Sequence, residues 1–195
     1  MAGKQAKIFC SREILQVLNH LKGTRYPLRD EVMFLLSIKA GLRAKEISFL
    51  TWGMITDASG RVGSSLHLPD NSSKGKSGRT IPLNQQLKQS LINLYHSYSE
   101  EPAQDHYVIF SERGTKMIPC NISHWFKKVF KALRLEGCSS HSGRRTFVTN
   151  AAKLIIQAGG SLRDVQQLAG HTSLQMTQSY IEGDNDAKRK VIELI

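Results

Sequence analysis

Two arginines, two histidines and a tyrosine stand in this sequence in an order that could do chemistry on a phosphate ester. Attack on a phosphodiester spreads negative charge over its free oxygens, and fixed guanidinium groups can hold that charge without a metal ion. Arginine stays charged and its planar fork matches two phosphate oxygens. Arg43 and Arg144 are therefore the candidate clamp. No dense carboxylate cluster stands at metal-ligand spacing, so we expect neither a metal site nor a cofactor.

The two histidines and the tyrosine would supply the proton transfers and the nucleophile. His141 and His171 could each donate to a phosphate oxygen or move a proton near neutral pH. His171 follows Gly170, which is typical of the left-handed end of a helix. Tyr180 is the candidate nucleophile, and because tyrosine titrates near ~10 it needs a base and a cationic surround. Each residue alone is more typical of a structural position, but the set of them favours a catalytic site.

The order and spacing of these residues resemble the tyrosine recombinase (phage integrase) family. The resemblance spans residues 26–180 and rests on Gly41-Leu42-Arg43-Ala44-Lys45-Glu46, Ser73-Lys74-Gly75-Lys76-Ser77-Gly78-Arg79, His141-Ser142-Gly143-Arg144, Leu168-Ala169-Gly170-His171 and Tyr180. It implies a site-specific DNA recombinase or integrase of mobile genetic elements, which cuts and rejoins strands through a 3′-phosphotyrosine intermediate. It also implies that Arg43, His141, Arg144, His171 and Tyr180 are catalytic, and that neither ATP nor metal is needed.

The resemblance assigns roles to two further positions. In the family a lysine in a β-hairpin protonates the departing 5′-oxygen, and the spacing to the strand at residues 80–83 points to Lys74, with Lys76 as the alternative. Without the family, this serine- and glycine-rich turn is more typical of a solvated loop. Glu46 matches the family's acidic position, where it would support Arg43; the alternative is an exposed ion pair of little consequence.

The pattern of apolar residues predicts a mainly α (α+β) fold, a compact helical catalytic domain with a small antiparallel β-sheet. Helical periodicity recurs at residues 11–22, 27–41, 43–52, 84–98, 121–134, 141–157 and 161–168. The period disappears over residues 57–82, where glycine, serine and β-forming residues predict the sheet, and residues 107–110 could be one more strand.

The domain boundaries follow from the same pattern. Residues 1–10 are expected to be a loose basic lead, residues 11–185 the recombinase catalytic domain, and residues 186–195 a tail. The apolar residues of that tail would fold back or dock on a neighbouring subunit. Most members of the family carry an N-terminal core-binding domain, for which the residues before the first matched helix are too few. The chain is thus expected to be a minimal recombinase or a piece of a longer protein.

The charge balance favours a polyanionic partner. Lysine and arginine outnumber aspartate and glutamate 27 to 16, the formal net charge is +11 and the pI is near 9.8. Residues 113–153 hold nine basic residues and a single acidic one. A basic helix face is often merely solvated, but this density beside the candidate site suggests contacts to DNA phosphates. The predicted contacts are Lys76, Arg79, Lys127, Lys128, Lys131 and Arg145.

The sequence also bears on the cellular compartment of the protein and on its binding partners. Three cysteines without paired spacing indicate free thiols in a reducing compartment, and no apolar run approaches a membrane span of about 20 residues. We expect a cytoplasmic, nucleoid-associated protein without membrane contact. Its partner would be double-stranded DNA, with a homotetramer on paired sites, monomers in solution, and an accessory recombinase or DNA-bending protein. The alternatives are type IB topoisomerase-like relaxation of DNA and a catalytically silent DNA-binding regulator.

Overall fold

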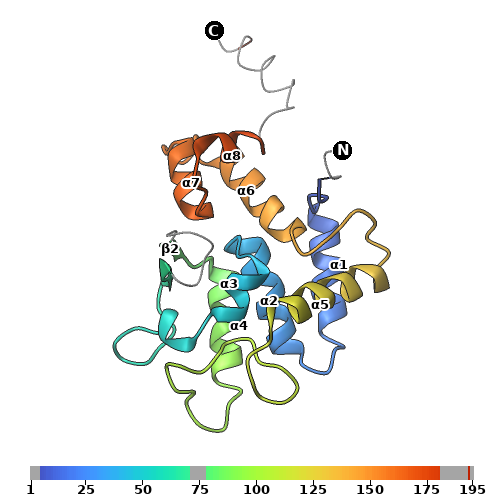
Figure 1. Cartoon of the computed structure of the whole chain (residues 1–195), viewed down its shortest axis with the longest axis vertical. Helices are drawn as coiled ribbons and strands as arrows, with labels where there is room; N and C mark the ends of the chain where they lie inside the picture. Colours follow the sequence, from blue (N-terminus) through green and yellow to red (C-terminus); the bar gives the residue numbers. More distant parts are fainter. Residues whose placement is uncertain (1–4, 71–77, 181–192, 194–195) are drawn as a thin grey trace.

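The computed structural model of the chain describes residues 5–70, 78–180 and 193 (Figure 1). Lys74, Lys76 and the tail 186–195, apart from Glu193, lie outside the described residues. Within the described part the chain is mainly helical with a small antiparallel sheet, which confirms the predicted fold class. The elements are α1 (Ser11–Leu21), α2 (Pro27–Lys39), α3 (Ala44–Phe49), the 3-10 helix η1 (Trp52–Met54), β1 (Ser65–Leu68), β2 (Arg79–Pro82), α4 (Gln85–Tyr95), α5 (Pro119–Ala132), α6 (Ser142–Leu154), α7 (Leu162–Ala169) and α8 (Leu174–Gln178).

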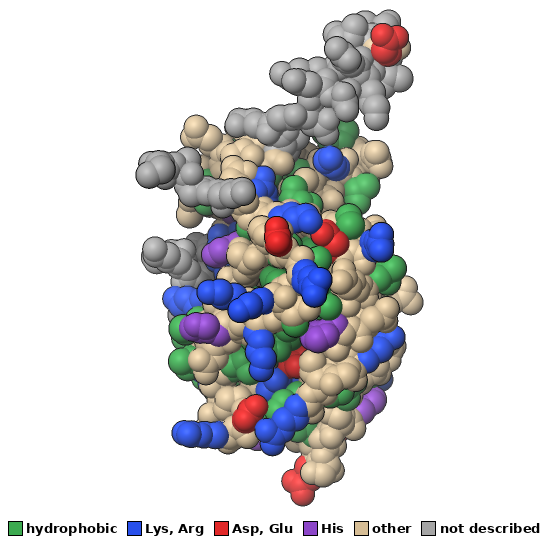
Figure 2. Space-filling model, turned by 90° about the vertical axis from the view of Figure 1, so that its right-hand side faces the viewer, with side chains coloured by type: hydrophobic (Ala, Val, Ile, Leu, Met, Phe, Trp, Pro, Cys, Tyr) green, Lys and Arg blue, Asp and Glu red, His purple; other side chains and the backbone are tan. Residues whose placement is uncertain are grey.

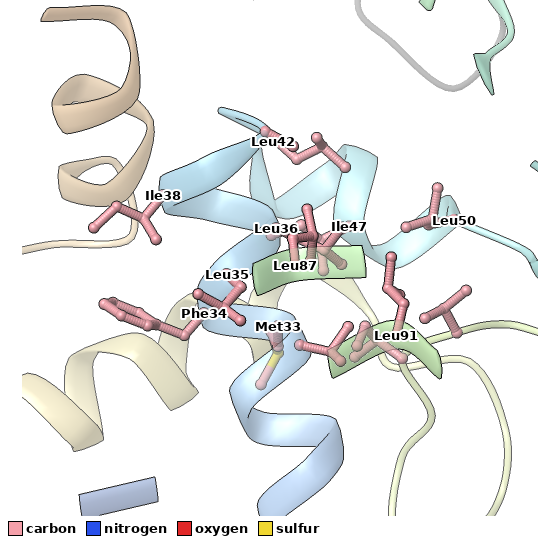
Figure 3. Packing of buried hydrophobic residues seen from close by; sticks show 14 of the residues in the cluster. Met33, Phe34, Leu35, Leu36, Ile38, Leu42, Ile47, Leu50, Leu87 and Leu91 are labelled. Atoms are coloured by element: carbon pink, nitrogen blue, oxygen red, sulfur yellow. The ribbon is translucent and has the colours of Figure 1, made fainter. Parts of the chain in front are cut away.

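Helix α2 lies at the centre of the molecule because it is apolar on nearly every side. Its buried apolar side chains are Val32, Met33, Phe34, Leu35, Leu36 and Ile38. A helix that is hydrophobic all round needs neighbours on every side, and α2 contacts α1, α3, α4 and α6. Figure 3 shows its side chains among Ile47 of α3 and Leu87 and Leu91 of α4. The helix begins with Pro27 in its first turn, as predicted.

The sheet consists of β1 and β2, which pair antiparallel with Ser65 opposite Pro82 and Leu68 opposite Arg79. Its position confirms the prediction for residues 57–82. The strand predicted at residues 107–110 is wrong: this segment makes isolated bridges, between Thr51 and Tyr107 and between Phe110 and Lys116, and no ladder. Its apolar residues are buried in a loop that crosses the end of the core, which explains the strand-like pattern.

The prediction of a loose lead is wrong for residues 5–10. The Phe9 side chain is buried, with its ring centroid 5.9 Å from that of Phe34 and 5.3 Å from that of Phe130. The Phe9 N–H donates to Thr146 Oγ1 (2.9 Å), and the Lys7 N–H donates to the Gly137 carbonyl (3.0 Å). The buried Phe9 side chain and these two hydrogen bonds from backbone N–H groups therefore anchor the segment on the main body.

Helices α6 and α7 form a second, smaller hydrophobic cluster. Its buried members are Val148, Ala152, Val165 and Ala169, and Phe147 and Tyr180 pack against it. In Figure 1, α6 runs from the main body toward α7 and α8. Helix α6 ends earlier than the predicted residue 157, and Leu154 at its end is 59% exposed because the chain turns away from the core there.

Candidate active site

A cavity of about 310 Å³ collects most of the side chains singled out from the sequence. Every predicted catalytic residue except Lys74, which lies outside the described residues, lines this cavity. The lining residues are Gln5, Ala6, Arg43, His141, Arg144, Arg145, His171, Met176, Ser179 and Tyr180. They come from the N-terminal segment, from the start of α3, from the start of α6 and from α8 with its flanks. The fold, and no single motif, brings them together.

Arg43 is held at the start of α3 by Glu46. Its backbone N–H donates to Glu46 Oε2 (2.8 Å) and its Nη1 donates to Oε1 (3.0 Å), so both backbone and guanidinium are fixed. The Glu46 side chain is only 1% exposed. Burial by itself raises the pKa of Glu46, but Arg79 and Arg43 outweigh burial and hold that pKa below its ordinary value. The alternative of an exposed ion pair is wrong, and Glu46 is available to support Arg43.

Arg79, predicted to contact DNA, is instead buried inside the protein. Its side chain is 6% exposed, and Nη1 and Nη2 donate to the two oxygens of Glu46 at 3.0 and 3.1 Å. Its Nε donates to the carbonyl of Leu168 (2.9 Å). The basic turn before Arg79 is what suggested DNA contact. The sequence holds no signal that joins Arg79 to a glutamate 33 positions earlier.

Arg144 is a buried guanidinium tied to two backbone carbonyls. Its Nη1 donates to Gly41 (2.7 Å) and its Nη2 donates to Ala169 (2.6 Å), and the residue is 4% exposed. Burial, and next the charge of Arg43, lower the pKa of Arg144 to about 10, so it remains a cation at neutral pH. Because arginine carries five N–H donors, the two carbonyl bonds orient the guanidinium and leave donors for an anion in the cavity.

Two glycines allow α6 to lie close enough to α2 for these bonds. Gly143 faces Ser37, whose Oγ would lie 2.3 Å from a Cβ at that position. Gly41 has a φ of +65°, and a Cβ there would lie 2.4 Å from the Phe147 ring. A side chain at either glycine would push α6 outward. These positions therefore set the depth at which Arg144 enters the site.

His171 follows directly after the left-handed Gly170 (φ +60°), as predicted. It is 6% exposed, and its Nδ1 lies 2.9 Å from Thr177 Oγ1. Burial, and then the charges of Arg144, Arg43 and Arg79, lower the pKa of His171 to about 4. The imidazole is therefore neutral at pH 7 and can donate a hydrogen bond without adding charge. Thr177 is not found from the sequence, because its spacing from His171 spans a turn and follows no helical period.

The Tyr180 ring stacks on His171 within the same chain. The ring centroids are 5.5 Å apart and the planes differ by 22°. The ring also packs against the small cluster of α6 and α7, which leaves Tyr180 half-buried at the edge of the cavity. The charge of an ionised Tyr180 would raise the pKa of Arg144, so the two groups interact across the cavity.

His141 and Arg145 border the cavity at the start of α6. His141 is exposed and stands at the cap position just before the helix. Arg145, a predicted DNA contact, donates from Nη1 to the Ala6 carbonyl (2.8 Å) and from Nη2 to the Gln5 side-chain oxygen. The N-terminal segment is thus a wall of the cavity, which the sequence did not indicate.

The lysines predicted to contact DNA on α5 face solvent. Lys127, Lys128 and Lys131 are all exposed, while Phe126 and Phe130 of the same helix are buried in the core. Figure 2 looks onto the side of the molecule where α1 and α5 lie, and lysine and arginine side chains spread over it. This distribution leaves the α5 lysines free for contact with a polyanion.

The described residues hold neither a candidate metal site nor a candidate membrane span. Within these ranges, no group of three or more His, Cys, Asp or Glu side chains is placed to hold a metal ion. None of the helices in the described part is long and apolar enough to cross a membrane.

Comparison with known proteins places these residues in a family context. The sequence model of the phage integrase family matches residues 7–186. The chain is 29% identical over 167 residues to the tyrosine recombinase XerC of Actinobacillus pleuropneumoniae, covering 85% of this chain and 51% of the relative. It is 31% identical over 163 residues to XerC of Rhizobium meliloti, covering 80% of this chain and 46% of the relative. The chain therefore spans about half the length of the curated relatives that it matches.

Solved structures show the same fold. The Tn1549 transposon integrase in complex with transposon right end DNA superposes with a TM-score of 0.76 at 18% identity, covering 100% of this chain and 67% of that one. A lambda integrase dimer bound to a COC′ core site superposes with a TM-score of 0.70 at 20% identity, covering 94% of this chain and 50% of that one. At these identities the likeness concerns the arrangement of the elements.

Proposed function

The chain belongs to the phage integrase family, and from this membership and the geometry of the cavity we propose that it cuts and rejoins DNA strands through a 3′-phosphotyrosine intermediate. The observation that carries the proposal is the convergence of Arg43, Arg144, His171 and Tyr180 on a single cavity. The curated relatives named above are tyrosine recombinases. Site-specific recombination is therefore the biological activity we propose.

The geometry suggests how the reaction would run. Arg43 and Arg144 would hold the free oxygens of the scissile phosphate, because both guanidinium groups are fixed before the substrate arrives. Neutral His171 would donate to one of these oxygens. The Tyr180 oxygen would attack phosphorus, passing its proton to His141 at the exposed side of the cavity. The bond to the 5′-oxygen would break as the phosphotyrosine bond forms.

The released 5′-oxygen needs a proton, which we propose comes from Lys74, with Lys76 as the alternative. Rejoining reverses the first step: a 5′-hydroxyl from a partner strand attacks the phosphotyrosine and frees Tyr180. One phosphate ester replaces another of similar energy, so this chemistry needs no ATP and none of the proposed steps uses a cofactor.

We propose double-stranded DNA as the partner, with Lys127, Lys128 and Lys131 tracking its phosphates. Two of the structural neighbours are complexes with DNA, which supports this choice. Exchange between two duplexes requires four active subunits, and we propose that these assemble on paired sites from monomers, with or without an accessory protein. A cytoplasmic location at the nucleoid goes with this role.

The test is trapping of the covalent intermediate. A pool of nicked duplexes with a randomised core loses a short fragment when cut, so an attacked strand stays bound to protein on a denaturing gel. We expect wild type to form this adduct and Tyr180→Phe to bind the pool equally well but form none. Tyr107→Phe, a half-buried tyrosine away from the cavity, is the matched control and should form the adduct.

The two alternative functions would give different results in this trapping experiment. A silent DNA-binding regulator would bind the pool and trap no adduct in any variant. A topoisomerase would form the adduct but would only relax a supercoiled plasmid, without new junctions between two sites. The family's named relatives are recombinases, so neither alternative is favoured.

A further inference from the structure

Arg79 connects two parts of the candidate site that are far apart in the sequence. From β2 it reaches the buried Glu46 of α3 with two hydrogen bonds and the Leu168 carbonyl of α7 with a third. Its side chain is 6% exposed. A guanidinium that makes three hydrogen bonds within the protein and has so little exposure is poorly suited to bind a ligand itself, but well suited to fix the groups that do.

The first of these groups is Arg43. Glu46 Oε1 accepts from both Arg43 and Arg79 at 3.0 Å, so the carboxylate is shared between two guanidinium groups. Without Arg79, the buried carboxylate would pair with Arg43 alone and would cancel much of its charge. Arg79 thus offsets the charge of Glu46, which leaves Arg43 positioned by that carboxylate and still attractive to an anion.

The second group is His171, two residues beyond the last residue of α7. The final carbonyls of that helix accept from Arg79 at Leu168 and from Arg144 at Ala169. Helix ends leave such carbonyls without intrahelical partners. Arg79 also packs against Gly170, where a Cβ would lie 2.7 Å from Nη1, so the glycine makes room for the guanidinium. The turn that presents His171 is therefore built around Arg79.

We infer that Arg79 is a positioning residue for strand cleavage, acting through Glu46 on Arg43 and through the end of α7 on His171. The inference rests on the proposed function, since it assigns Arg79 a part in that reaction without contact to DNA. It replaces the interpretation of Arg79 as a phosphate contact.

The experiment separates binding from cleavage. Affinity for the nicked duplex pool is measured by fluorescence anisotropy, and the rate constant of adduct formation is measured in single turnover at saturating DNA. We expect Arg79→Gln to bind within about threefold of wild type and to cleave about 10- to 100-fold more slowly, the range typical of groups that orient an active residue. Arg79→Lys should recover part of the rate, because an ammonium keeps the charge but cannot make all three bonds.

Two controls guard against trivial effects. Arg61→Gln removes the same charge from an exposed turn and should leave both affinity and rate unchanged. If a thermal unfolding measurement shows that Arg79→Gln does not fold, affinity and cleavage rate are compared between Arg79→Lys and wild type instead. In a Glu46→Gln background, Arg79→Gln should slow cleavage less than in wild type, because the path through Glu46 is already broken.

The two measurements separate a positioning role of Arg79 from a direct contact with DNA. A weaker affinity with a normal rate at saturation would make Arg79 a DNA contact and overturn the inference, as would wild-type behaviour in both measurements. If wild type itself forms no adduct, the proposed function fails, and a second measurement decides the role of Arg79. NMR titration of the histidines should then show a higher pKa for His171 in Arg79→Gln than in wild type. An unchanged pKa would overturn the inference independently of activity.

Discussion

The free energy of unfolding depends on pH through the buried imidazole of His171. The contribution of this one side chain can be measured. Burial and three arginine charges lower its folded-state pKa to about 4, from 6.5. The unfolded chain binds a proton at His171 near pH 6.5, whereas the folded chain binds it only near pH 4. Folding is therefore favoured by neutral His171 above pH 6.5, and this contribution is lost as pH falls toward 4.

The size of the effect follows from the two pKa values. A fall from 6.5 to about 4 is equivalent to about 3 kcal/mol of free energy. His171→Gln keeps a polar side chain but cannot titrate. We therefore expect the difference in free energy of unfolding between wild type and His171→Gln to shift by about 3 kcal/mol against wild type between pH 7 and pH 4. Below pH 4 the folded imidazole is protonated too, so the difference should stop changing.

Urea unfolding at a series of pH values measures this difference directly, because other titrating groups are the same in both proteins. NMR of ¹³C-labelled histidine gives the folded-state pKa, and loss of one of the seven histidine signals in His171→Gln identifies the resonance. A His171 signal that titrates near 6.5, or a stability difference that stays constant with pH, would refute the account of a desolvated imidazole among three guanidinium groups.

Three other changes test separate parts of the site. Arg144→Ala should lower adduct formation about 100- to 1000-fold, as for loss of a preorganised charge donor, and an unchanged rate would rule out the clamp. Lys74→Ala should slow cleavage of ordinary DNA but not of DNA with a bridging 5′-sulfur, whose thiolate needs no proton. If the sulfur substrate rescues Lys76→Ala instead, Lys76 is the residue that protonates the 5′-oxygen. Gly143→Ala should destabilise the fold by about 1–3 kcal/mol in urea unfolding, because its Cβ would collide with a serine of α2. Gly23→Ala, whose nearest neighbour is 3.7 Å away, is the matched control and should unfold like wild type.

The helices were predictable because their signals are local. Pro27 marks the start of α2, Asn84 caps α4 through the Gln86 N–H, and Ser161 with Asp164 forms the capping box of α7. Each signal needs only neighbours within four residues. The start of α8 carries the same kind of local signal, since the Ser173 side chain accepts a hydrogen bond from the Met176 N–H.

The site was predictable in its membership but not in its internal bonds. Residue types and order, read with the family resemblance, gave Arg43, Arg144, His171 and Tyr180. Two of the bonds that hold the site together join distant positions: Arg79 lies 33 residues from Glu46, and Arg144 lies 103 residues from the Gly41 carbonyl. Partners at such separations are chosen by tertiary packing, which leaves no period or motif in the sequence.

The division of the interior into two clusters gives the molecule two levels of local stability. Arg43 borders the large cluster around α2, whereas Tyr180 packs against the smaller cluster of α6 and α7. Because burial energy scales with apolar area, the smaller unit can open at a free energy far below that of global unfolding. Tyr180 thus packs on the less stable unit of the molecule, whereas Arg43 is held by the more stable one.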